Sequence, residues 1–172
     1  MDEFNLIVST FRFKEEDAED EILELLDKFG DPAAESEIIE IKGMILVQTS
    51  LDPLTIIDKL KEIVASEPWQ VRYILRVLPI QDVVPTRLDT ISHAASELIT
   101  KIGKDTFRVT VEKRHNSIGS MQIIKAIADQ INNKVDLENP DWVILVQVLG
   151  GLTGVSVLRP NQIFSSVIEK RK

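Results

Sequence analysis

The stretch TFRVTVEKRHNSIGSMQIIKAIADQI, residues 106–131, decides the architecture of the second half of the chain. Phe107, Val109 and Val111 alternate with polar residues, which predicts a strand with one solvent-facing side. From Ser120 to Ile131, apolar residues recur at helical spacing. The predicted helix buries Met121, Ile124, Ile127 and Ile131.

The segments on either side of this stretch extend the pattern. The run Val143–Leu149 is almost wholly apolar, which is typical of a central strand covered on both faces. Gly150 and Gly151 indicate a tight connection to a last strand at Val155–Leu158. Strand, helix and strand in this order predict a right-handed crossover. Upstream, a helix is expected from Thr86, its candidate cap, with Asp89 three residues later.

The first half predicts a separate arrangement of elements. In order, these are a strand at 4–13, a helix at 15–29, strands at 37–41 and 44–49, a helix that Asp52 caps, and an extended run at 71–84. Strand, helix, strand, strand, helix, strand is the ferredoxin-like order. Because Pro79 and Pro85 interrupt both patterns, we expect an α/β (α+β) protein with a ferredoxin-like domain at 1–84 and a second domain at 85–172 with a mixed sheet.

Composition excludes several classes of protein. The chain has 172 residues and no cysteine, so disulfides, thiolate metal sites and cysteine nucleophiles are excluded. No apolar run approaches the roughly 20 residues of a membrane helix. The acidic start, Met1-Asp2-Glu3, does not fit a signal peptide. We therefore expect a cytoplasmic protein without a membrane partner.

Charge is distributed unevenly along the chain. Residues 1–82 carry 8 Lys and Arg against 19 Asp and Glu, whereas residues 83–172 carry 12 against 9. The overall net charge of −8 thus arises in the first half. This asymmetry favours the second half as the part that binds a polyanion.

Residues that could perform catalysis are few. The sequence holds two histidines, and no spacing typical of metal ligands occurs. We expect His93 to be an ordinary surface or packing residue. The segment Gly150–Gly154 matches neither a dinucleotide fingerprint nor a phosphate-binding loop. The sequence therefore predicts a protein that is not an enzyme, with no catalytic residue, metal site, cofactor or small-molecule substrate.

A basic loop joins the predicted strand to the predicted helix. Lys113, Arg114, His115 and Ser117 precede a helix start, where outward-pointing backbone amides favour phosphate. The positive charges of Lys113 and Arg114 add attraction for phosphate, and Ser117 adds a hydroxyl donor. The alternative reading is a loop that is merely solvated.

Four further cations are candidates for the same surface. Arg108 lies on the wet side of the strand, Lys104 just before it, Lys125 one turn into the helix, and Arg159 after the last strand. If the crossover forms as predicted, several of these side chains converge at one end of the sheet.

The stretch from Thr106 to Leu158 resembles the THUMP domain, an RNA-binding module attached to several tRNA-modifying enzymes. The resemblance rests on motifs at consistent spacing: Thr106–Val109, the Lys113–His115 loop with Ser117, Val135–Asp141, Val143–Val146 and Gly154–Leu158. It implies a ferredoxin-like domain before the module. It also implies that Lys113 and Arg114 contact RNA phosphates and that His115 stacks on or hydrogen-bonds to a base or ribose.

The length of the chain leaves no room for a catalytic domain after the module, so the chain looks like the stand-alone type. That type is similar to the adaptor that helps an acetyltransferase form N4-acetylcytidine in tRNA. The resemblance therefore implies a non-catalytic tRNA-binding adaptor whose partners are tRNA and a tRNA-modifying acetyltransferase. Two alternatives stay open. One is a protein-interaction or regulatory module without RNA binding, which the acidic half would suit. The other is an enzyme that uses a pocket between the domains.

Overall fold

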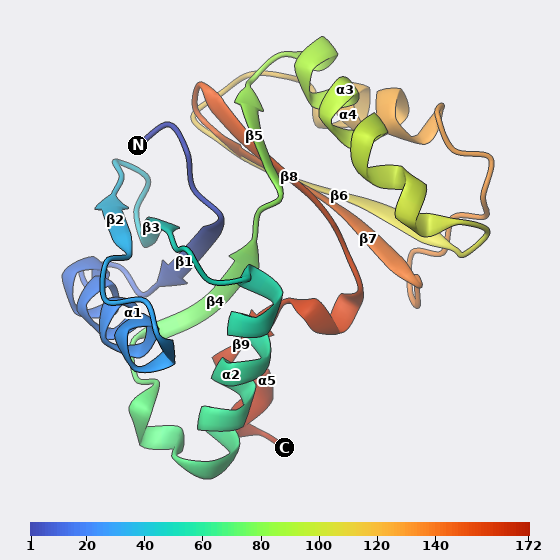
Figure 1. Cartoon of the computed structure of the whole chain (residues 1–172). Helices are drawn as coiled ribbons and strands as arrows, with labels where there is room; N and C mark the ends of the chain where they lie inside the picture. Colours follow the sequence, from blue (N-terminus) through green and yellow to red (C-terminus); the bar gives the residue numbers. More distant parts are fainter. The chain divides into compact units, whose positions relative to one another are not determined.

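The structure is a computed structural model that describes all 172 residues. The chain divides into two compact units (Figure 1). Unit 1 comprises Met1–Ile80 together with Gln162–Lys172, and unit 2 comprises Gln81–Asn161. None of the helices combines the length and the apolar character that a membrane span requires.

Unit 1 is built on a five-stranded antiparallel sheet in the order β2-β3-β1-β4-β9. The first four strands follow the predicted ferredoxin-like order, which is thereby confirmed. The elements of unit 1 are β1 (Leu6–Thr10), α1 (Glu15–Phe29), β2 (Glu35–Ile38), β3 (Met44–Gln48), α2 (Pro53–Ser66), a 3₁₀ turn (Pro68–Gln70), β4 (Ile74–Pro79), β9 (Phe164–Ser165) and α5 (Ser166–Lys170).

Local sequence signals explain where the two long helices of unit 1 begin and end. The Asp52 carboxylate accepts a hydrogen bond from the Leu54 N–H at 3.0 Å, and Pro53 occupies the first position of α2. Gly30 ends α1 in the left-handed conformation with φ of 115°. Both helices pack their apolar stripes against the sheet in one core, in which Ile22, Leu60 and others are fully buried.

The last eleven residues belong to unit 1, which differs from the sequence-based division at residue 85. Strand β9 pairs with β4, placing Ser165 opposite Arg76 and Phe164 opposite Val77. The Phe164 side chain is completely buried in the core of unit 1. A two-residue strand is too short to show a periodic pattern, so the sequence offered no signal for this return of the chain.

Asp31 makes the stability of unit 1 depend on pH. The Thr49 hydroxyl donates to its carboxylate at 2.6 Å, and the Ser50 N–H donates at 2.9 Å. The Thr49 hydrogen bond is the main reason that the pKa of Asp31 lies below its usual value. Because the pKa is lowered on folding, the stabilisation is present above the unfolded pKa of about 4 and is lost as the pH falls through the folded pKa.

We expect Asp31→Asn to lose this acid-dependent part of the stability. The free energy of unfolding, measured by urea titration between pH 3 and pH 7, should fall more steeply with acid in the natural chain than in the variant. Asp58→Asn, on the exposed face of α2, is the matched control and should retain the natural slope. Equal slopes in all three proteins would contradict the assignment.

Unit 2 is built on a four-stranded mixed sheet in the order β5-β8-β7-β6. Strands β6 and β7 are parallel, and the other two pairs are antiparallel. The elements of unit 2 are β5 (Asp82–Pro85), α3 (Leu88–Leu98), a 3₁₀ turn (Ile99–Ile102), β6 (Phe107–Arg114), α4 (Ser120–Ala128), β7 (Trp142–Leu149) and β8 (Leu152–Leu158). A further 3₁₀ turn, Pro160–Gln162, lies where the chain leaves unit 2.

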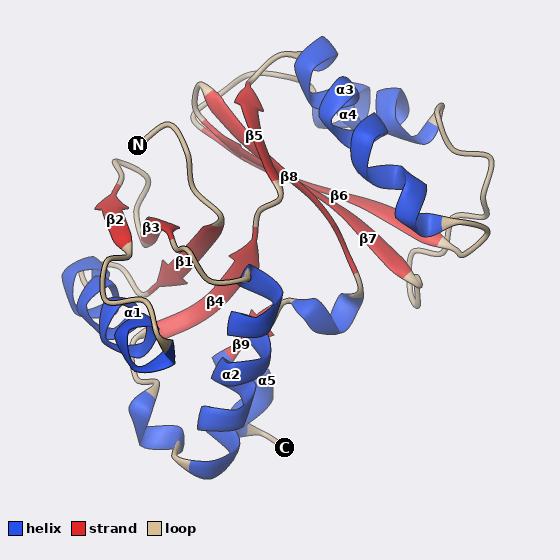
Figure 2. Cartoon of the chain, in the orientation of Figure 1, coloured by secondary structure: helices blue, strands red, loops and turns tan.

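Helices α3 and α4 cover one face of this sheet (Figure 2). Phe107, Val109 and Val111 of β6 point toward the helices, as their alternation predicted. The predicted burial of the β7 run is confirmed for Ile144–Leu149. Two local predictions were wrong, and their causes differ.

The first wrong prediction concerns α4. Its buried residues are Ile123 and Ile127, whereas the Met121 side chain is 73% exposed. The helix begins at Ser120 as predicted but ends at Ala128, before Ile131. Its buried face contains Ile127 of the predicted stripe and Ile123, which was not predicted. The second concerns Thr86. Arg87 is the N-cap of α3, and the Thr86 hydroxyl instead lies 2.8 Å from the Thr153 hydroxyl of β8.

Candidate nucleic-acid interface

The basic loop and the starts of two helices lie at one end of the strands of the unit 2 sheet. The strand register places Pro85, Leu152, Leu149 and Arg114 in a single row across all four strands. Beyond this row lie the junction of β5 with α3, the turn between β7 and β8, and the loop from β6 to α4. Figure 1 shows these three connections at the same end of the sheet. We call this end the α-start edge, because α3 and α4 both begin there.

Hydrogen bonds hold the basic loop against the β7–β8 turn. The Gly150 N–H donates to the Arg114 carbonyl at 2.8 Å, and the Asn116 amide donates to the Gly150 carbonyl at 3.0 Å. The Asn116 side-chain oxygen also accepts from the Ile118 N–H at 2.8 Å. His115 has a φ of 58°, a left-handed conformation that non-glycine residues seldom adopt. The loop therefore has a defined shape before any ligand binds.

Within this loop, Lys113 is the cation most accessible to a ligand. Its ammonium donates one hydrogen bond, to the Ile118 carbonyl at 2.8 Å, and an ammonium has three N–H groups. His115 and Ser117 are exposed beside it. Helix α4 begins after Gly119, and no side chain caps its first amides. Lys113, Ser117 and the uncapped start of α4 thus all lie on the connection from β6 to α4.

Arg114 lies on the other face of the sheet from Lys113. Its guanidinium donates to the Gln147 side-chain oxygen at 3.1 Å and to the Glu112 carboxylate at 3.1 Å, and 27% of its side chain is exposed. The Gln147 amide in turn donates to Glu112 at 3.2 Å. The carboxylate offsets much of the arginine charge. Arg114 therefore stabilises the end of β6 and also contributes positive charge to the edge. Its acidic partner, Glu112, belongs to unit 2.

Lys125 lies further along α4, with 76% of its side chain exposed. Its ammonium pairs with the Asp129 carboxylate one turn later at 2.8 Å. Exposed pairs of this kind contribute little energy, so Lys125 remains available to a polyanion. It projects from the helix some 7 Å along its axis from the α-start edge.

The expected convergence of Arg108, Lys104 and Arg159 with the basic loop was wrong. Arg108 pairs with Val143 at the start of the parallel strands, six residues from Arg114. Strand β8 is antiparallel to β7, so it ends where β6 begins and carries Arg159 to that end. The two groups are separated by the length of the strands, about 20 Å.

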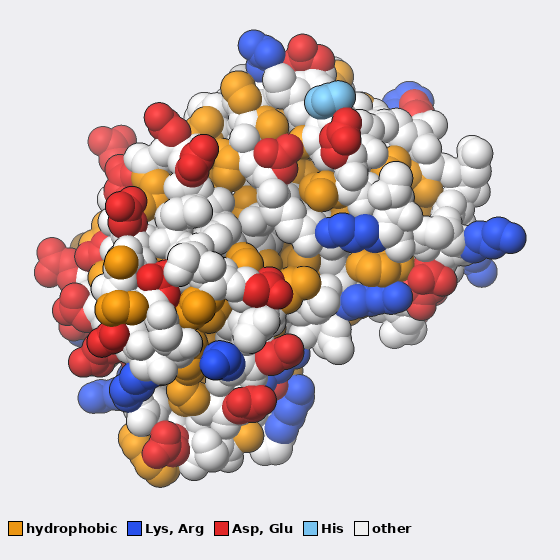
Figure 3. Space-filling view, viewed as in Figure 1, with side chains coloured by type: hydrophobic (Ala, Val, Ile, Leu, Met, Phe, Trp, Pro, Cys, Tyr) orange, Lys and Arg blue, Asp and Glu red, His pale blue; other side chains and the backbone are white.

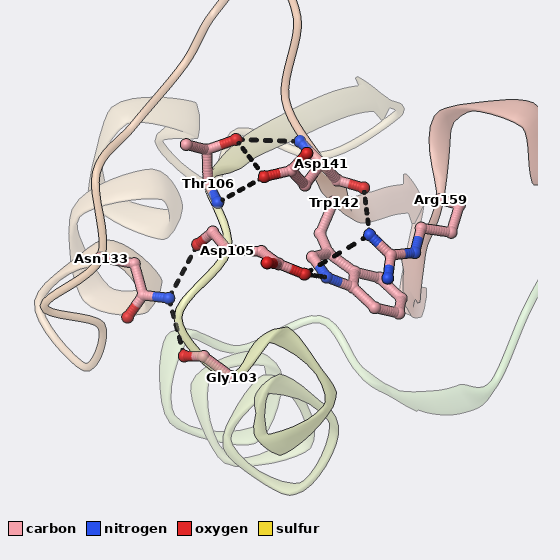
Figure 4. A network of polar contacts seen from close by, with 7 residues as sticks. All are labelled: Gly103, Asp105, Thr106, Asn133, Asp141, Trp142 and Arg159. Carbon is pink, nitrogen blue, oxygen red and sulfur yellow. Dashed lines mark hydrogen bonds and ion pairs between the residues drawn. The ribbon is translucent and has the colours of Figure 1, made fainter.

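A network of polar contacts occupies this opposite end (Figure 4). The Arg159 guanidinium lies 3.8 Å from the centroid of the Trp142 ring and 3.5 Å from the Asp105 carboxylate. The Trp142 indole N–H donates to the same carboxylate at 3.0 Å. The Thr106 N–H and hydroxyl both donate to Asp141 at 3.0 Å, which holds the pKa of that carboxyl below its usual value. Stacking and ion pairing give Arg159 a structural role.

The other two cations at this end differ in their contacts. Arg108 donates to the Leu137 carbonyl at 2.9 Å, which fastens the loop before β7. Lys104 is exposed. Asp105 and Asp141 belong to the network, and Asp136 and Glu138 lie in the segment before β7, so acidic residues balance the positive charge at this end.

The division of charge between the units differs from its division along the sequence. Unit 2 contains nine Lys and Arg and nine Asp and Glu, so its net charge is zero. The positive excess of the second half comes from Lys170, Arg171 and Lys172, which belong to unit 1. Unit 1 nevertheless remains acidic, with Asp and Glu side chains gathered over α1 and β2 in Figure 3. Any attraction of unit 2 for a polyanion is therefore local to an edge and does not come from its net charge.

Residues 85–158 match the family model described as the THUMP domain. This part of the chain is a THUMP domain. Such domains bind RNA, tRNA in particular, and are associated with tRNA modification. The THUMP domain occupies most of unit 2, from the last residue of β5 to the last residue of β8.

Curated relatives match over part of their length. THUMP domain-containing protein 1 of Bos taurus is 27% identical over 115 residues, which cover 61% of this chain and 32% of the relative. The proteins of the same name from Mus musculus and Homo sapiens are 26% and 25% identical over the same length. The match thus spans about a third of the length of these relatives.

Solved structures share the fold over about nine-tenths of the chain. PH1313 from Pyrococcus horikoshii Ot3 has a TM-score of 0.64 at 20% identity, covering 90% of this chain and 54% of that protein. TrmN from Thermus thermophilus has a TM-score of 0.63 at 18% identity and covers 91% and 46%. A 4-thiouridine synthetase in complex with RNA and ATP has a TM-score of 0.58 at 18% identity and covers 91% and 42%. These likenesses concern the fold alone.

Proposed function

We propose that this protein is a non-catalytic tRNA-binding adaptor, which presents tRNA to a separate modification enzyme, a tRNA cytidine acetyltransferase that forms N4-acetylcytidine. The proposal rests on the α-start edge of the THUMP domain, where Lys113, His115 and Ser117 are exposed beside the uncapped start of α4. Lysine neutralises phosphate as a point charge, and free amides at a helix start donate to phosphate oxygens. Such an edge binds a nucleic-acid backbone.

The carboxylates with shifted pKa values support a non-catalytic role. Asp31, Asp89, Asp136 and Asp141 all have a lowered pKa, and the largest cause in each case is a hydrogen bond that shapes a turn or a helix start. A carboxylic acid that donates a proton near neutral pH has a raised pKa, which is the opposite direction. The shifts therefore report structural hydrogen bonds.

Recognition through the RNA backbone predicts two measurable properties of binding. Binding should depend on the shape of the RNA more than on its sequence, because helical RNA is read through phosphates and 2′-hydroxyls. Affinity should also fall steeply with salt, because each phosphate contact releases counterions and contributes about −0.7 to −0.9 to the slope of log K against log salt.

Replacing Lys113 by alanine tests the interface directly. The affinity for unmodified tRNA, measured by filter binding between 50 and 200 mM salt, should fall roughly 3- to 10-fold, and the salt slope should become shallower by about one phosphate contact. Lys134→Ala removes the same charge from a loop at the opposite end of the sheet and serves as the matched control. Equal affinity in the Lys113 variant and the natural chain would remove this site from the proposal.

The adaptor role needs a separate experiment. Purified cytidine acetyltransferase, tRNA and acetyl donor are incubated with and without the protein, and N4-acetylcytidine is quantified after nuclease digestion. The proposal predicts more product with the natural chain, and a smaller gain with Lys113→Ala. Modification by the protein alone would make it an enzyme. Binding to a protein partner without any affinity for tRNA would favour an interaction module, which the acidic groove of about 460 Å³ beside α1 and Trp69 would suit.

A further inference from the structure

Arg87 lies at the α-start edge, although sequence motifs do not associate it with the basic loop. It is the N-cap residue of α3, two residues after Pro85. Pro85 stands in the same cross-strand row as Arg114, and the Thr86 N–H donates to the Gly151 carbonyl of the β7–β8 turn at 2.9 Å. The register therefore fixes Arg87 at one corner of the edge and the basic loop at the other.

The spacing of the two corners follows from the geometry of the sheet. Strands β5 and β6 are the outer strands of the four, so three strand spacings separate them, which is roughly 14 Å. This distance is too long for both corners to hold one phosphate group. It is short enough for both to contact separate phosphates of one RNA segment.

The contacts of Arg87 leave it able to bind an anion. Its guanidinium pairs with the Asp89 carboxylate at 3.2 Å, and both side chains are largely exposed, 64% and 77%. An exposed pair of this kind contributes little energy, so a phosphate can replace the carboxylate. Arg87 contrasts with Arg159, whose guanidinium is stacked on an indole, and with Arg114, whose guanidinium is shared by two side chains.

Resting on the proposed function, we infer that Arg87 is a second phosphate-binding point of the THUMP domain, which binds the same RNA as Lys113 at a phosphate several positions away along the backbone. The ligand class is an RNA segment long enough to span the edge. Helix α3, like α4, begins at this edge, so the positive end of its dipole adds to the attraction at this corner.

The experiment measures tRNA affinity and its salt dependence for Arg87→Ala, Arg87→Lys, Lys113→Ala and the double variant, with Lys134→Ala as the control. We expect Arg87→Ala to weaken binding about 3- to 10-fold and to reduce the salt slope by about 0.7 to 0.9, while Arg87→Lys retains most of the affinity. Because the corners are well separated, the logarithms of the two single effects should add in the double variant. Thermal unfolding checks that the exposed substitutions leave the fold intact.

The outcomes separate this inference from the proposed function. If Lys113→Ala weakens binding and Arg87→Ala binds like the natural chain, the inference is overturned and the proposed function stands. If the natural chain does not bind tRNA at 50 mM salt, both fail. If Arg87→Lys is as weak as Arg87→Ala while thermal unfolding is unchanged, a simple charge contact to phosphate is excluded and the inference fails.

Discussion

Replacing Phe164 by alanine is expected to lower the free energy of unfolding of unit 1 by about 3 to 5 kcal/mol. The ring is completely buried in the core of unit 1, where β9 lies against β4 and α2, and it is the only large apolar side chain that β9 contributes. Its removal leaves a cavity that the antiparallel pairing of β4 with β9 prevents from collapsing freely. Losses of this size are a large part of the stability of an ordinary domain.

Urea denaturation of the natural chain and the variant measures this effect. Amide hydrogen exchange assigns it, since amides of β4 should exchange faster whereas those of β7 should keep their protection. Val167→Ala, at the second position of α5, is the control because Val167 is 46% exposed. An unchanged denaturation midpoint for Phe164→Ala would mean that the C-terminal segment does not belong to the core of unit 1.

Replacing Arg114 by alanine should destabilise unit 2 by about 2 to 3 kcal/mol and weaken tRNA binding as well. Gln147 is fully buried, and its side-chain oxygen would lose the guanidinium as donor. Breaking a buried charged pair costs more than an exposed one, and the partial exposure of Arg114 places it between these limits. Lys113, one residue earlier, has an exposed side chain, so its replacement should affect binding alone.

Variants of Arg114 and Lys113 distinguish an effect on the stability of unit 2 from an effect on tRNA binding. Unfolding by urea is measured for Arg114→Ala, Lys113→Ala and Arg114→Lys, and tRNA affinity is measured at a temperature at which all three are folded. Arg114→Lys keeps the positive charge but cannot donate to Gln147 and Glu112 at once as the guanidinium does. Compared with Arg114→Ala, it should therefore restore tRNA affinity more than it restores stability. Equal stability of Arg114→Ala and the natural chain would show that the guanidinium does not support the end of β6.

The elements of the chain were predictable wherever they were long and periodic. The apolar stripe of α1, the cap at Asp52 and the alternation in β6 each follow from side-chain spacing, and the structure contains all three. Short elements escaped detection, since β9 has two residues and α5 five. A periodic signal needs more residues than these elements contain.

The residues of the candidate site also differ in whether the sequence alone predicts that they lie together. Lys113, Arg114, His115 and Ser117 are contiguous, so a single loop carries them whatever the fold. Arg108 lies near the start of β6, the strand that ends in the loop, and Arg159 follows β8, far along the chain. Their distance from the loop is set by the length and direction of the strands. The same register brings Arg87 to the edge, where no motif had indicated it.

The sequence by itself determined the ferredoxin-like order of the first unit, the strand and helix of the second, and the basic loop between them, because these depend on neighbours along the chain. Only the tertiary structure decided which cations share an edge, which of them have acidic partners, and to which unit the last eleven residues belong. The physical reason is that strand pairing and direction are set by contacts between residues far apart in sequence. The preference of each residue for helix or strand does not specify those contacts.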